Sequence, residues 1–431
     1  MNDLHDMSCK ARQAFYELSV SSDTIRNSVL ARMSELLKAN REIVFKANRE
    51  DLALAEKEGL PAPLLHRLVF GEEKLDSVCS GLRSLQSLPD PIGKTTLATE
   101  ISEGLTLYRV VCPIGVIGVI FESRPDALIQ IASLCIKSGN AVLLKGGREA
   151  QRTNQELSEI VRKSLSASGL SENAAQLLET REDVAAMLKE DELIDLIIPR
   201  GSNAFVRHIM DNSRIPVLGH SDGICHVYVD KDADPDIAVR IVTDSKTQNV
   251  SVCNAAETLL VHSDIAAGLL PAIAENLRRN GVKILGDEST RKLIDCEAAA
   301  EEDWSREYLD YIISVKTVAS VQQAVEHINH YGSHHTDCII TENDETAAFF
   351  LNSVDSAGVY RNVSTRFADG FIYGFGAEVG IATGKLHARG PMGLEGLTTY
   401  KYKLIGHGQI LADVKSGKQK LTHRPLLLSE T

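Results

Sequence analysis

The stretch VIGVIFESRPDALIQIASLCIKSGNAVLLKGGREA, residues 116–150, decides the fold of this chain. It begins with an unbroken apolar run over 116–121, which is typical of a strand buried on both faces. Residues 126–138 predict a helix that Gly139-Asn140 ends, and residues 141–144 predict a second apolar strand. Because buried strands alternate with helices here, the sequence predicts a parallel sheet with helices on both faces.

The alternation of strands and helices continues beyond this stretch. Strands are expected at 193–198 and 215–218, and helices near 184–188 and from Asn203. A second α/β unit begins with a strand at 226–229. Its further strands are expected at 258–262, 282–285, 311–316 and 338–341, and its helices at 264–280 and 321–330. The sequence therefore predicts an α/β protein with two parallel sheets.

The flanking segments have different patterns. Residues 8–90 carry apolar side chains at helical spacing, and residues 98–111 alternate around Glu103-Gly104, which predicts a hairpin. Residues 370–396 are polar and rich in glycine, and 397–404 are strand-like. We expect the tail from about residue 405 to be loosely structured.

Composition excludes several classes of protein. The chain has 431 residues, a formal net charge of -13 and an isoelectric point near 5.5, which argues against nucleic acid or an anionic membrane as the main partner. Its eight cysteines are scattered without a Cys-x-x-Cys pair, which is typical of a reduced intracellular protein. The polar N-terminus has no signal-peptide core, and the longest apolar stretch is too short to span a bilayer. A cytoplasmic protein is expected.

Cys253 is the strongest candidate for chemistry. It lies in a polar turn, Ser251-Val252-Cys253-Asn254, directly before an apolar strand-like run. A thiolate is a potent nucleophile that forms thioesters, and this position presents it at the end of a strand. The alternative is a buried cysteine that acts only as a small apolar side chain.

Two basic turns are candidates for binding anions. Lys145-Gly146-Gly147-Arg148 follows a predicted strand and precedes a helix, where glycines and helix N–H groups can approach a phosphate. Arg200-Gly201-Ser202 ends the next strand and points to the same crevice. In both cases the alternative is an ordinary loop with solvated cations.

A third basic segment, Arg361 to Arg366, holds two guanidinium groups that could clamp a carboxylate or phosphate, or lie on a surface turn. Four histidines gather nearby in sequence: His327, His330, His334 and His335. They lack a metal-binding motif, so structural or substrate-adjacent histidines are favoured and no metal is expected.

Four long motifs carry a resemblance to a known family. They are PIGVIGVIFESRPD (113–126), CNAAET (253–258), VASVQQAVEHINHYGSHHTDCI (318–339) and KLHARGPMGLE (385–395). Together they resemble the aldehyde dehydrogenase superfamily, and more closely its γ-glutamyl phosphate reductase branch. The resemblance extends over about residues 8–410 and accounts for the histidine run without a metal.

The resemblance implies an aldehyde dehydrogenase-like α/β fold with a small β oligomerisation element. Residues 1–97 and 112–224 are expected to bind NADP(H), and residues 225–396 to form the catalytic domain with the Cys253 loop. Residues 98–111 and 397–410 are expected to supply the oligomerisation hairpin and strand, which makes the protein a homo-oligomer.

The implied reaction is the NADPH-dependent reduction of L-glutamyl 5-phosphate to L-glutamate 5-semialdehyde and phosphate through a thioester on Cys253, the second step of proline biosynthesis from glutamate. Glutamate 5-kinase is a candidate partner. The stretch 217–220 carries no carboxylate where hydrolytic aldehyde dehydrogenases have a water-activating glutamate. The alternatives are a non-phosphorylating dehydrogenase that oxidises a small aldehyde to its acid, and a non-enzymatic descendant.

The resemblance also implies roles for individual residues. Lys145, Gly146, Gly147 and Arg148 would hold the adenosine ribose and its 2′-phosphate, and Gly201 and Ser202 would meet the pyrophosphate. Glu307 would bind the nicotinamide ribose. From charge and position, we expect the substrate to be bound by Arg124, Asn254, Ser364, Thr365 and Arg366.

Overall fold

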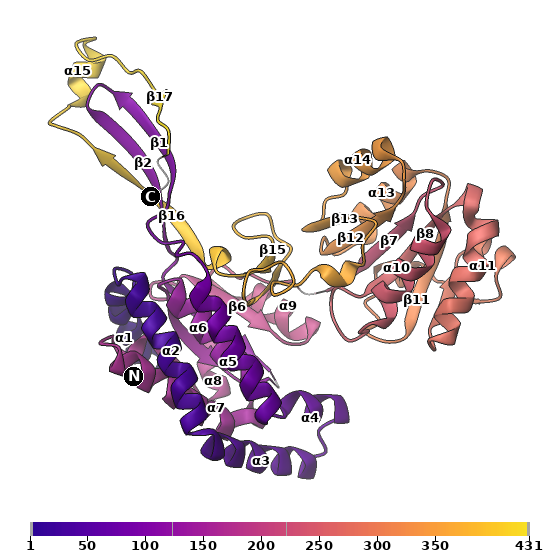
Figure 1. Cartoon of the computed structure of the whole chain (residues 1–431), viewed down its shortest axis with the longest axis horizontal. Coiled ribbons are helices and arrows are strands. Elements are labelled where there is room, and N and C mark those ends of the chain that lie inside the picture. Colours follow the sequence, from indigo (N-terminus) through magenta and orange to yellow (C-terminus); the bar gives the residue numbers. More distant parts are fainter. Residues whose placement is uncertain (1–2, 123, 221, 429–431) are drawn as a thin grey trace.

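The computed structural model describes residues 3–122, 124–220 and 222–428. Ser123 of the expected cofactor loop therefore lies outside the described residues. Figure 1 shows a helix-covered unit at the N-terminal end, a second α/β unit formed by the middle of the chain, and a projecting antiparallel sheet. The two predicted parallel sheets are both present.

The N-terminal region is helical, as its periodicity predicts. Its helices are α1 (Asp3–Leu18), α2 (Asp23–Ala39), α3 (Arg41–Lys57), α4 (Ala62–Leu68) and α5 (Glu72–Ser87). The Ser22 hydroxyl caps α2 by accepting a hydrogen bond from the N–H of Ile25. Apolar side chains of α2 and α5 join the same core as the first parallel sheet, and these helices pack on α6 (Pro125–Lys137) and α7 (Gln151–Ala167), which lie against its strands.

The first parallel sheet has the strand order β5-β4-β3-β6. Its strands are β3 (Val116–Phe121), β4 (Ala141–Lys145), β5 (Ala175–Leu178) and β6 (Leu196–Arg200), and its helices are α6 (Pro125–Lys137), α7 (Gln151–Ala167), α8 (Arg181–Met187) and α9 (Asn203–Asn212), with the short 3-10 turns η1 (Arg148–Ala150) and η2 (Glu172–Ala174). Every residue of β3 and β4 is buried. The predicted strand at 215–218 is wrong, because only Val217 forms an isolated bridge with Ile197 at the sheet edge.

The second parallel sheet has the strand order β10-β9-β11-β8-β7-β12-β13. Its strands are β7 (Cys225–Val229), β8 (Ala256–His262), β9 (Lys283–Gly286), β10 (Glu297–Ala298), β11 (Ile312–Val318), β12 (Thr336–Ile340) and β13 (Gly358–Arg361). The elements that cover it are α10 (Pro235–Thr247), α11 (Ser263–Arg279), α12 (Glu288–Leu293), η3 (Glu301–Ser305), α13 (Val321–Tyr331) and α14 (Asp344–Ser353). Two separate apolar clusters form its core.

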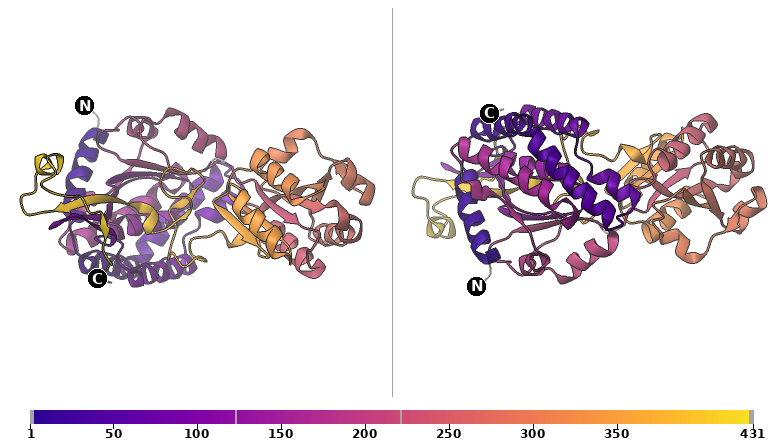
Figure 2. Two further views of the ribbon diagram at one scale, coloured as in Figure 1. Left: turned by 90° about the horizontal axis from the view of Figure 1, so that it is seen from above. Right: turned by 90° about the horizontal axis from the view of Figure 1, so that it is seen from below.

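The predicted hairpin forms β1 (Thr95–Ser102) and β2 (Leu105–Pro113), and the predicted C-terminal strand, β16 (Thr398–Ile405), pairs with β2. Gly104 turns the hairpin with φ 67°, a conformation that favours glycine. This sheet projects from the body of the molecule (Figure 1), and in the view from above in Figure 2 its C-terminal tip extends beyond the N-terminal unit.

The tail is more ordered than its sequence predicts. It forms α15 (Leu411–Lys415) and β17 (Arg424–Pro425), which pairs with β1. The N–H of Thr422 also donates to the Ile101 carbonyl at 2.8 Å. Backbone pairing with an existing edge strand orders this segment, and that is a tertiary effect that local sequence does not report.

Residues 365–397 cross from the second parallel sheet to the first through η4 (Thr365–Phe367), β14 (Gly380–Ala382), β15 (Gly390–Met392) and η5 (Glu395–Leu397). Figure 1 shows β15 between the two units. On the first unit, Glu378 of this segment lies 3.9 Å from Arg200. No described helix has the length and apolar character needed to cross a membrane.

Asn140 joins three elements at their starting points. Its Oδ1 accepts a hydrogen bond from the N–H of Gly115, which precedes β3, and its Nδ2 donates to the carbonyl of Leu397, which precedes β16, both at 2.8 Å. Asn140 itself precedes β4 and is buried. One amide therefore connects the parallel sheet to the projecting sheet.

Asn140→Leu is expected to lower the free energy of unfolding by at least about 2 kcal/mol, because each buried polar group left without a partner costs about 1–3 kcal/mol. Chemical denaturation followed by circular dichroism measures the loss. The matched control is Asn352→Leu on the exposed face of α14, where a change within about 0.5 kcal/mol is expected. Equal effects of the two variants would contradict this role of Asn140.

Candidate functional site

Cys253 lies in the turn between α10 and β8, at the amino end of β8. Two neighbouring strands begin at the same edge, because Cys225 of β7 pairs with Ala256 of β8, and β12 begins at Thr336 beside β7. Segments far apart in sequence therefore bring their side chains together around Cys253. The thiol is partly buried, as the turn predicts for an accessible nucleophile.

The imidazole of His335 contacts the thiol. Its Nε2 lies 3.2 Å from the Sγ of Cys253, and its Nδ1 lies 2.9 Å from the hydroxyl of Thr336. A histidine in this position can take the thiol proton and leave a thiolate. Sequence reasoning did not select His335 individually. The available signal was its place in the histidine run, but nothing local reveals that it faces residue 253.

The backbone of the Cys253 turn lies against Gly223. A Cβ at residue 223 would stand 2.2 Å from the carbonyl oxygen and 2.4 Å from the Cα of Cys253, so only glycine fits. The thiol of Cys225 donates to the same carbonyl oxygen at 3.2 Å, and burial raises the pKa of Cys225, which keeps it a thiol donor. These contacts fix the position of the nucleophile.

His220 packs against His335 and also lies close to the Cys253 thiol. The two rings meet edge to face with centroids 4.9 Å apart, and the Nδ1 of His220 donates to the carbonyl of Ile381 at 2.9 Å. Burial lowers the pKa of His220, so this ring is neutral. The stretch 217–220 thus does reach the thiol, and the side chain that it brings there is an imidazole.

The predicted substrate residues of η4 surround the same turn. The Thr365 hydroxyl donates to the Asn254 carbonyl at 2.7 Å, and the Asn254 side-chain amide donates to the Ala368 carbonyl at 2.9 Å. The Oδ1 of Asn254 is buried with no hydrogen-bond partner. Thr365 therefore holds the turn, while the Asn254 oxygen can accept from a bound molecule.

The other residues expected to bind the substrate come from two places: Arg124 lies on the first parallel-sheet unit, and Ser364 and Arg366 lie in or beside η4. Ser364 is buried and lies beside Ser245, and the Nε of Arg366 donates to Gln248 at 2.9 Å. Burial lowers the pKa of Arg366. Arg124 is exposed at the start of α6, 3.6 Å from Asp126.

The expected cofactor residues lie at the carboxyl ends of the first sheet. Lys145 and Arg200 end β4 and β6, on either side of the end of β3. A Cβ at Gly146 would stand 2.2 Å from the Nδ2 of Asn154, and the buried Oδ1 of Asn154 has no partner. Gly146 and Asn154 therefore form a narrow space, in which the Asn154 Oδ1 can accept a hydrogen bond. Gly147 follows it, and the exposed side chain of Arg148 stands at its rim.

The second half of this crevice is the start of α9. A Cβ at Gly201 would stand 2.8 Å from the Oε2 of Glu122, so the backbone passes close to that side chain. Ser202 is the N-cap of α9, but its side chain makes no capping hydrogen bond. The first amides of α9 can therefore bind an anion, which fits the pyrophosphate expected there.

Glu307 lies between the crevice and the nucleophile. Its Oε1 accepts from the N–H of Gly223 at 3.0 Å, and its Oε2 accepts from the side chain of Asn203, the first residue of α9. Gly223 in turn contacts Cys253. The carboxylate therefore connects the start of α9 to the backbone that lies against the Cys253 turn.

A buried ion pair joins α10 and β8, the two elements on either side of the Cys253 turn. The Nζ of Lys246 in α10 lies 2.5 Å from the Oε2 of Glu257 in β8, and both side chains are fully buried. Burial raises the pKa of Glu257 to about 7 and lowers that of Lys246, and their mutual attraction opposes both shifts. Glu257 also accepts from the N–H of Leu309 at 3.3 Å, which ties β8 to the segment of Glu307.

The four histidines of residues 327–335 do not converge on a common site. His327 is buried with its ring against Trp304 and Tyr331, and its Nδ1 lies 3.4 Å from the Nζ of Lys316. Burial lowers the pKa of His327 to about 2. His330 is exposed, and His334 contacts the Asp355 carbonyl through its Nδ1. Within this run, His335 is the member that contacts Cys253.

The buried His327 makes stability depend on pH. Its pKa is about 2 in the folded chain against an ordinary 6.5, so below pH 6.5 the unfolded chain gains a proton that the folded chain excludes. Stability should therefore fall by about 1.4 kcal/mol per pH unit from this residue as the solution is acidified. His327→Gln should reduce the slope in denaturation titrations, and the exposed His330→Gln should not. Identical slopes in both variants would refute this assignment.

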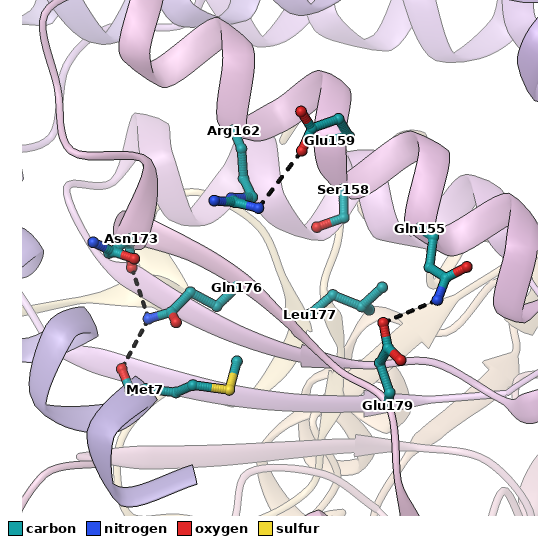
Figure 3. A pocket seen from close by; sticks show the side chains of 9 residues that line it. All are labelled: Met7, Gln155, Ser158, Glu159, Arg162, Asn173, Gln176, Leu177 and Glu179. Atoms are coloured by element: carbon teal, nitrogen blue, oxygen red, sulfur yellow. Dashed lines mark hydrogen bonds and ion pairs between the residues drawn. The ribbon is translucent and has the colours of Figure 1, made fainter. Parts of the chain in front are cut away.

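A separate pocket of about 410 Å³ lies at the outer edge of the first sheet. Figure 3 shows polar side chains of its lining bonded to one another, with Gln155 to Glu179 and Arg162 to Glu159. The lining residues are Met7, Gln155, Ser158, Glu159, Arg162, Asn173, Gln176, Leu177 and Glu179. None of them is a predicted site residue, so this pocket is distinct from the Cys253 site.

Comparison with known proteins agrees with this geometry. Residues 1–292 match the aldehyde dehydrogenase family. The gamma-glutamyl phosphate reductase of Acetivibrio thermocellus is 55% identical over 423 residues, which cover 98% of each chain. Gamma-glutamyl phosphate reductase 1 of Synechocystis sp. is 53% identical over 427 residues, or 99% of each chain.

The similarity extends to three dimensions. The crystal structure of gamma-glutamyl phosphate reductase from Thermotoga maritima superimposes with a TM-score of 0.93 at 38% sequence identity. The match covers 95% of this chain and 100% of that one. The expected aldehyde dehydrogenase-like fold is confirmed.

Proposed function

Because the chain belongs to the aldehyde dehydrogenase family and, within it, to the gamma-glutamyl phosphate reductases, we propose that it reduces L-glutamyl 5-phosphate to L-glutamate 5-semialdehyde with NADPH. This is the second step of proline biosynthesis from glutamate. The observation that carries the chemistry is the 3.2 Å contact between the Sγ of Cys253 and the Nε2 of His335.

The first half of the reaction is acyl transfer to Cys253. His335 accepts the thiol proton, the thiolate attacks the acyl carbon, and the carbon–oxygen bond to phosphate breaks. Phosphate leaves with the bonding electron pair, and a thioester remains on Cys253. Backbone N–H groups of the 251–254 turn stabilise the oxyanion on the way. Phosphate is a good leaving group at neutral pH, so little acid catalysis is needed.

The second half reduces the thioester. NADPH, when bound, supplies the hydride. Lys145, Gly146, Gly147 and Arg148 hold its adenosine ribose and 2′-phosphate, Gly201 and Ser202 its pyrophosphate, and Glu307 the nicotinamide ribose. As the carbon–sulfur bond breaks, the sulfur keeps the bonding electron pair and takes back the proton from His335, which releases the aldehyde and restores the thiol and the neutral imidazole. In the stretch 217–220, the side chain that lies beside His335 is the imidazole of His220 rather than a water-activating carboxylate, which favours reduction over hydrolysis.

Arg124, Arg366, Ser364 and Asn254 bind the carboxylate and amino groups of the substrate. An anionic substrate needs such a local cluster of cations because the chain as a whole carries a net charge of -13. Thr365 contributes indirectly, because its hydroxyl donates to the Asn254 carbonyl and so holds the turn.

Residues 1–97 and 112–224 act as the NADPH-binding domain, and residues 225–396 as the catalytic domain. Residues 98–111 and 397–410 mediate a homo-oligomer, supported by the exposed Tyr400, Tyr402 and Leu404 on the edge strand β16. Glutamate 5-kinase is a further partner, because its acyl phosphate product is labile and direct transfer between the two enzymes would protect it.

Eight unpaired cysteines favour the cytoplasm as the compartment.

The reverse reaction tests the proposal most directly. Glutamate 5-semialdehyde with NADP⁺ should yield NADPH absorbance only when inorganic phosphate is present, because phosphate must cleave the thioester. Cys253→Ala should lower turnover by on the order of 10⁴-fold or more, since the nucleophile is lost. Cys9→Ser, a surface cysteine of α1, is the matched control and should retain activity. Turnover without phosphate would instead establish the non-phosphorylating dehydrogenase.

Preference for NADPH should depend on Arg148. Arg148→Ala is expected to raise the KM for NADPH by about tenfold or more and to leave that for NADH within about twofold, because one charge-assisted contact to the 2′-phosphate is lost. Steady-state kinetics with both cofactors measure the split. Arg152→Ala, which removes a nearby cation paired with Glu50 and Asp51, should change neither value. A parallel loss for both cofactors would contradict the assignment.

A further inference from the structure

We propose that His220, Cys253 and His335 form a binding site for one zinc-class divalent cation, which reversibly withdraws the nucleophile from catalysis. That the bound ion inhibits rests on the function proposed above. That it binds rests on the geometry of the three side chains alone.

The three donors already converge. One ring nitrogen from each histidine and the Sγ of Cys253 lie within 4.8 Å of one another, and the Nε2 of His335 lies 3.2 Å from the sulfur. Tetrahedral zinc with bonds of about 2.3 Å to sulfur and 2.0–2.1 Å to nitrogen places sulfur and nitrogen about 3.6 Å apart and two nitrogens about 3.3 Å apart. Side-chain movements of up to about 1.5 Å therefore suffice to close the site.

Both histidines are oriented as metal ligands commonly are. The carbonyl of Ile381 can only accept, so the Nδ1 of His220 carries the proton and the lone pair is on Nε2. The Nδ1 of His335 contacts the hydroxyl of Thr336, which can donate or accept, so this contact orients the ring and leaves its Nε2 toward Cys253. Outer contacts of this kind orient metal ligands.

The donor set selects the cation. One thiolate and two imidazoles suit zinc, and they leave a fourth position for water. On binding, the thiol proton is released to solvent and a sulfur–metal bond forms, with no change of oxidation state. The sulfur lone pair is then held by the metal, so acyl transfer stops until a chelator removes the ion.

The arrangement is specific to this place in the fold. Across residues 3–122, 124–220 and 222–428, this is the group of three histidine, cysteine or carboxylate side chains that converges within such distances. Cys9 provides a natural comparison, because its Sγ lies 3.8 Å from the Nε2 of one histidine, His5, on the surface of α1. It has a thiol and an imidazole but no second imidazole.

Direct binding provides the first test. The full-length, chelator-treated protein is titrated with Zn²⁺ in competition with a chromophoric chelator, and with Co²⁺ followed by its thiolate charge-transfer absorption. One ion per subunit is expected. Cys253→Ser and His220→Ala should each weaken binding by about 100-fold or more, since loss of even an outer-shell partner costs 10–100-fold. Cys9→Ser should leave both readouts unchanged, and thermal unfolding checks that the variants are folded.

A second test needs no variant. In the unmodified protein, Zn²⁺ should slow alkylation of Cys253, measured by mass spectrometry, while Cys9 and Cys296 react at unchanged rates. Addition of a chelator should restore the rate. Zinc binding that survives Cys253→Ser, full affinity in His220→Ala, or no protection of Cys253 would each overturn the site. Failure of phosphate-dependent turnover would refute only the proposed function, because these readouts do not depend on activity.

Discussion

The contact between Gly223 and the Cys253 turn is the constraint on which the rest of the site depends. The two backbones approach so closely that a Cβ would stand 2.2 Å from the Cys253 carbonyl oxygen. Because Gly223 also donates to Glu307, the position of the nucleophile and that of the nearby carboxylate are set together. A side chain at residue 223 would displace both.

The side chains around the Cys253 site are rich in positive charge, whereas the chain as a whole is negatively charged. The chain is acidic, yet Arg124, Arg200 and Arg366 lie around the Cys253 region. Burial lowers the pKa of Arg200, and the neighbouring Glu378 opposes that shift. The ion pair of Lys246 and Glu257, in α10 and β8 on either side of the Cys253 turn, is fully buried and so adds no exposed charge. A local field for an anionic substrate thus coexists with an acidic surface.

Contacts between the two parallel-sheet units complete the site. The carboxyl ends of the first sheet supply the crevice at Lys145 and Gly201, and the amino ends of the second supply Cys253 and His335. Asn203 and Glu307 bridge them directly, and residues 365–397 bridge them a second time through Glu378 and Arg200. Neither unit holds all of the predicted residues.

The sequence by itself determined most of the elements and indicated Cys253 as the candidate nucleophile. The alternation after residue 116, the hairpin at Gly104 and the placement of Cys253 before a strand are local patterns, and neighbouring residues encode them. The strand predicted at 215–218 was wrong because an apolar run can also line a sheet edge with a single bridge. Only the tertiary structure decided that His335 meets Cys253 across 82 positions, that His220 joins them, and that Lys246 pairs with Glu257. Those meetings depend on strand order, which periodicity along one segment does not specify.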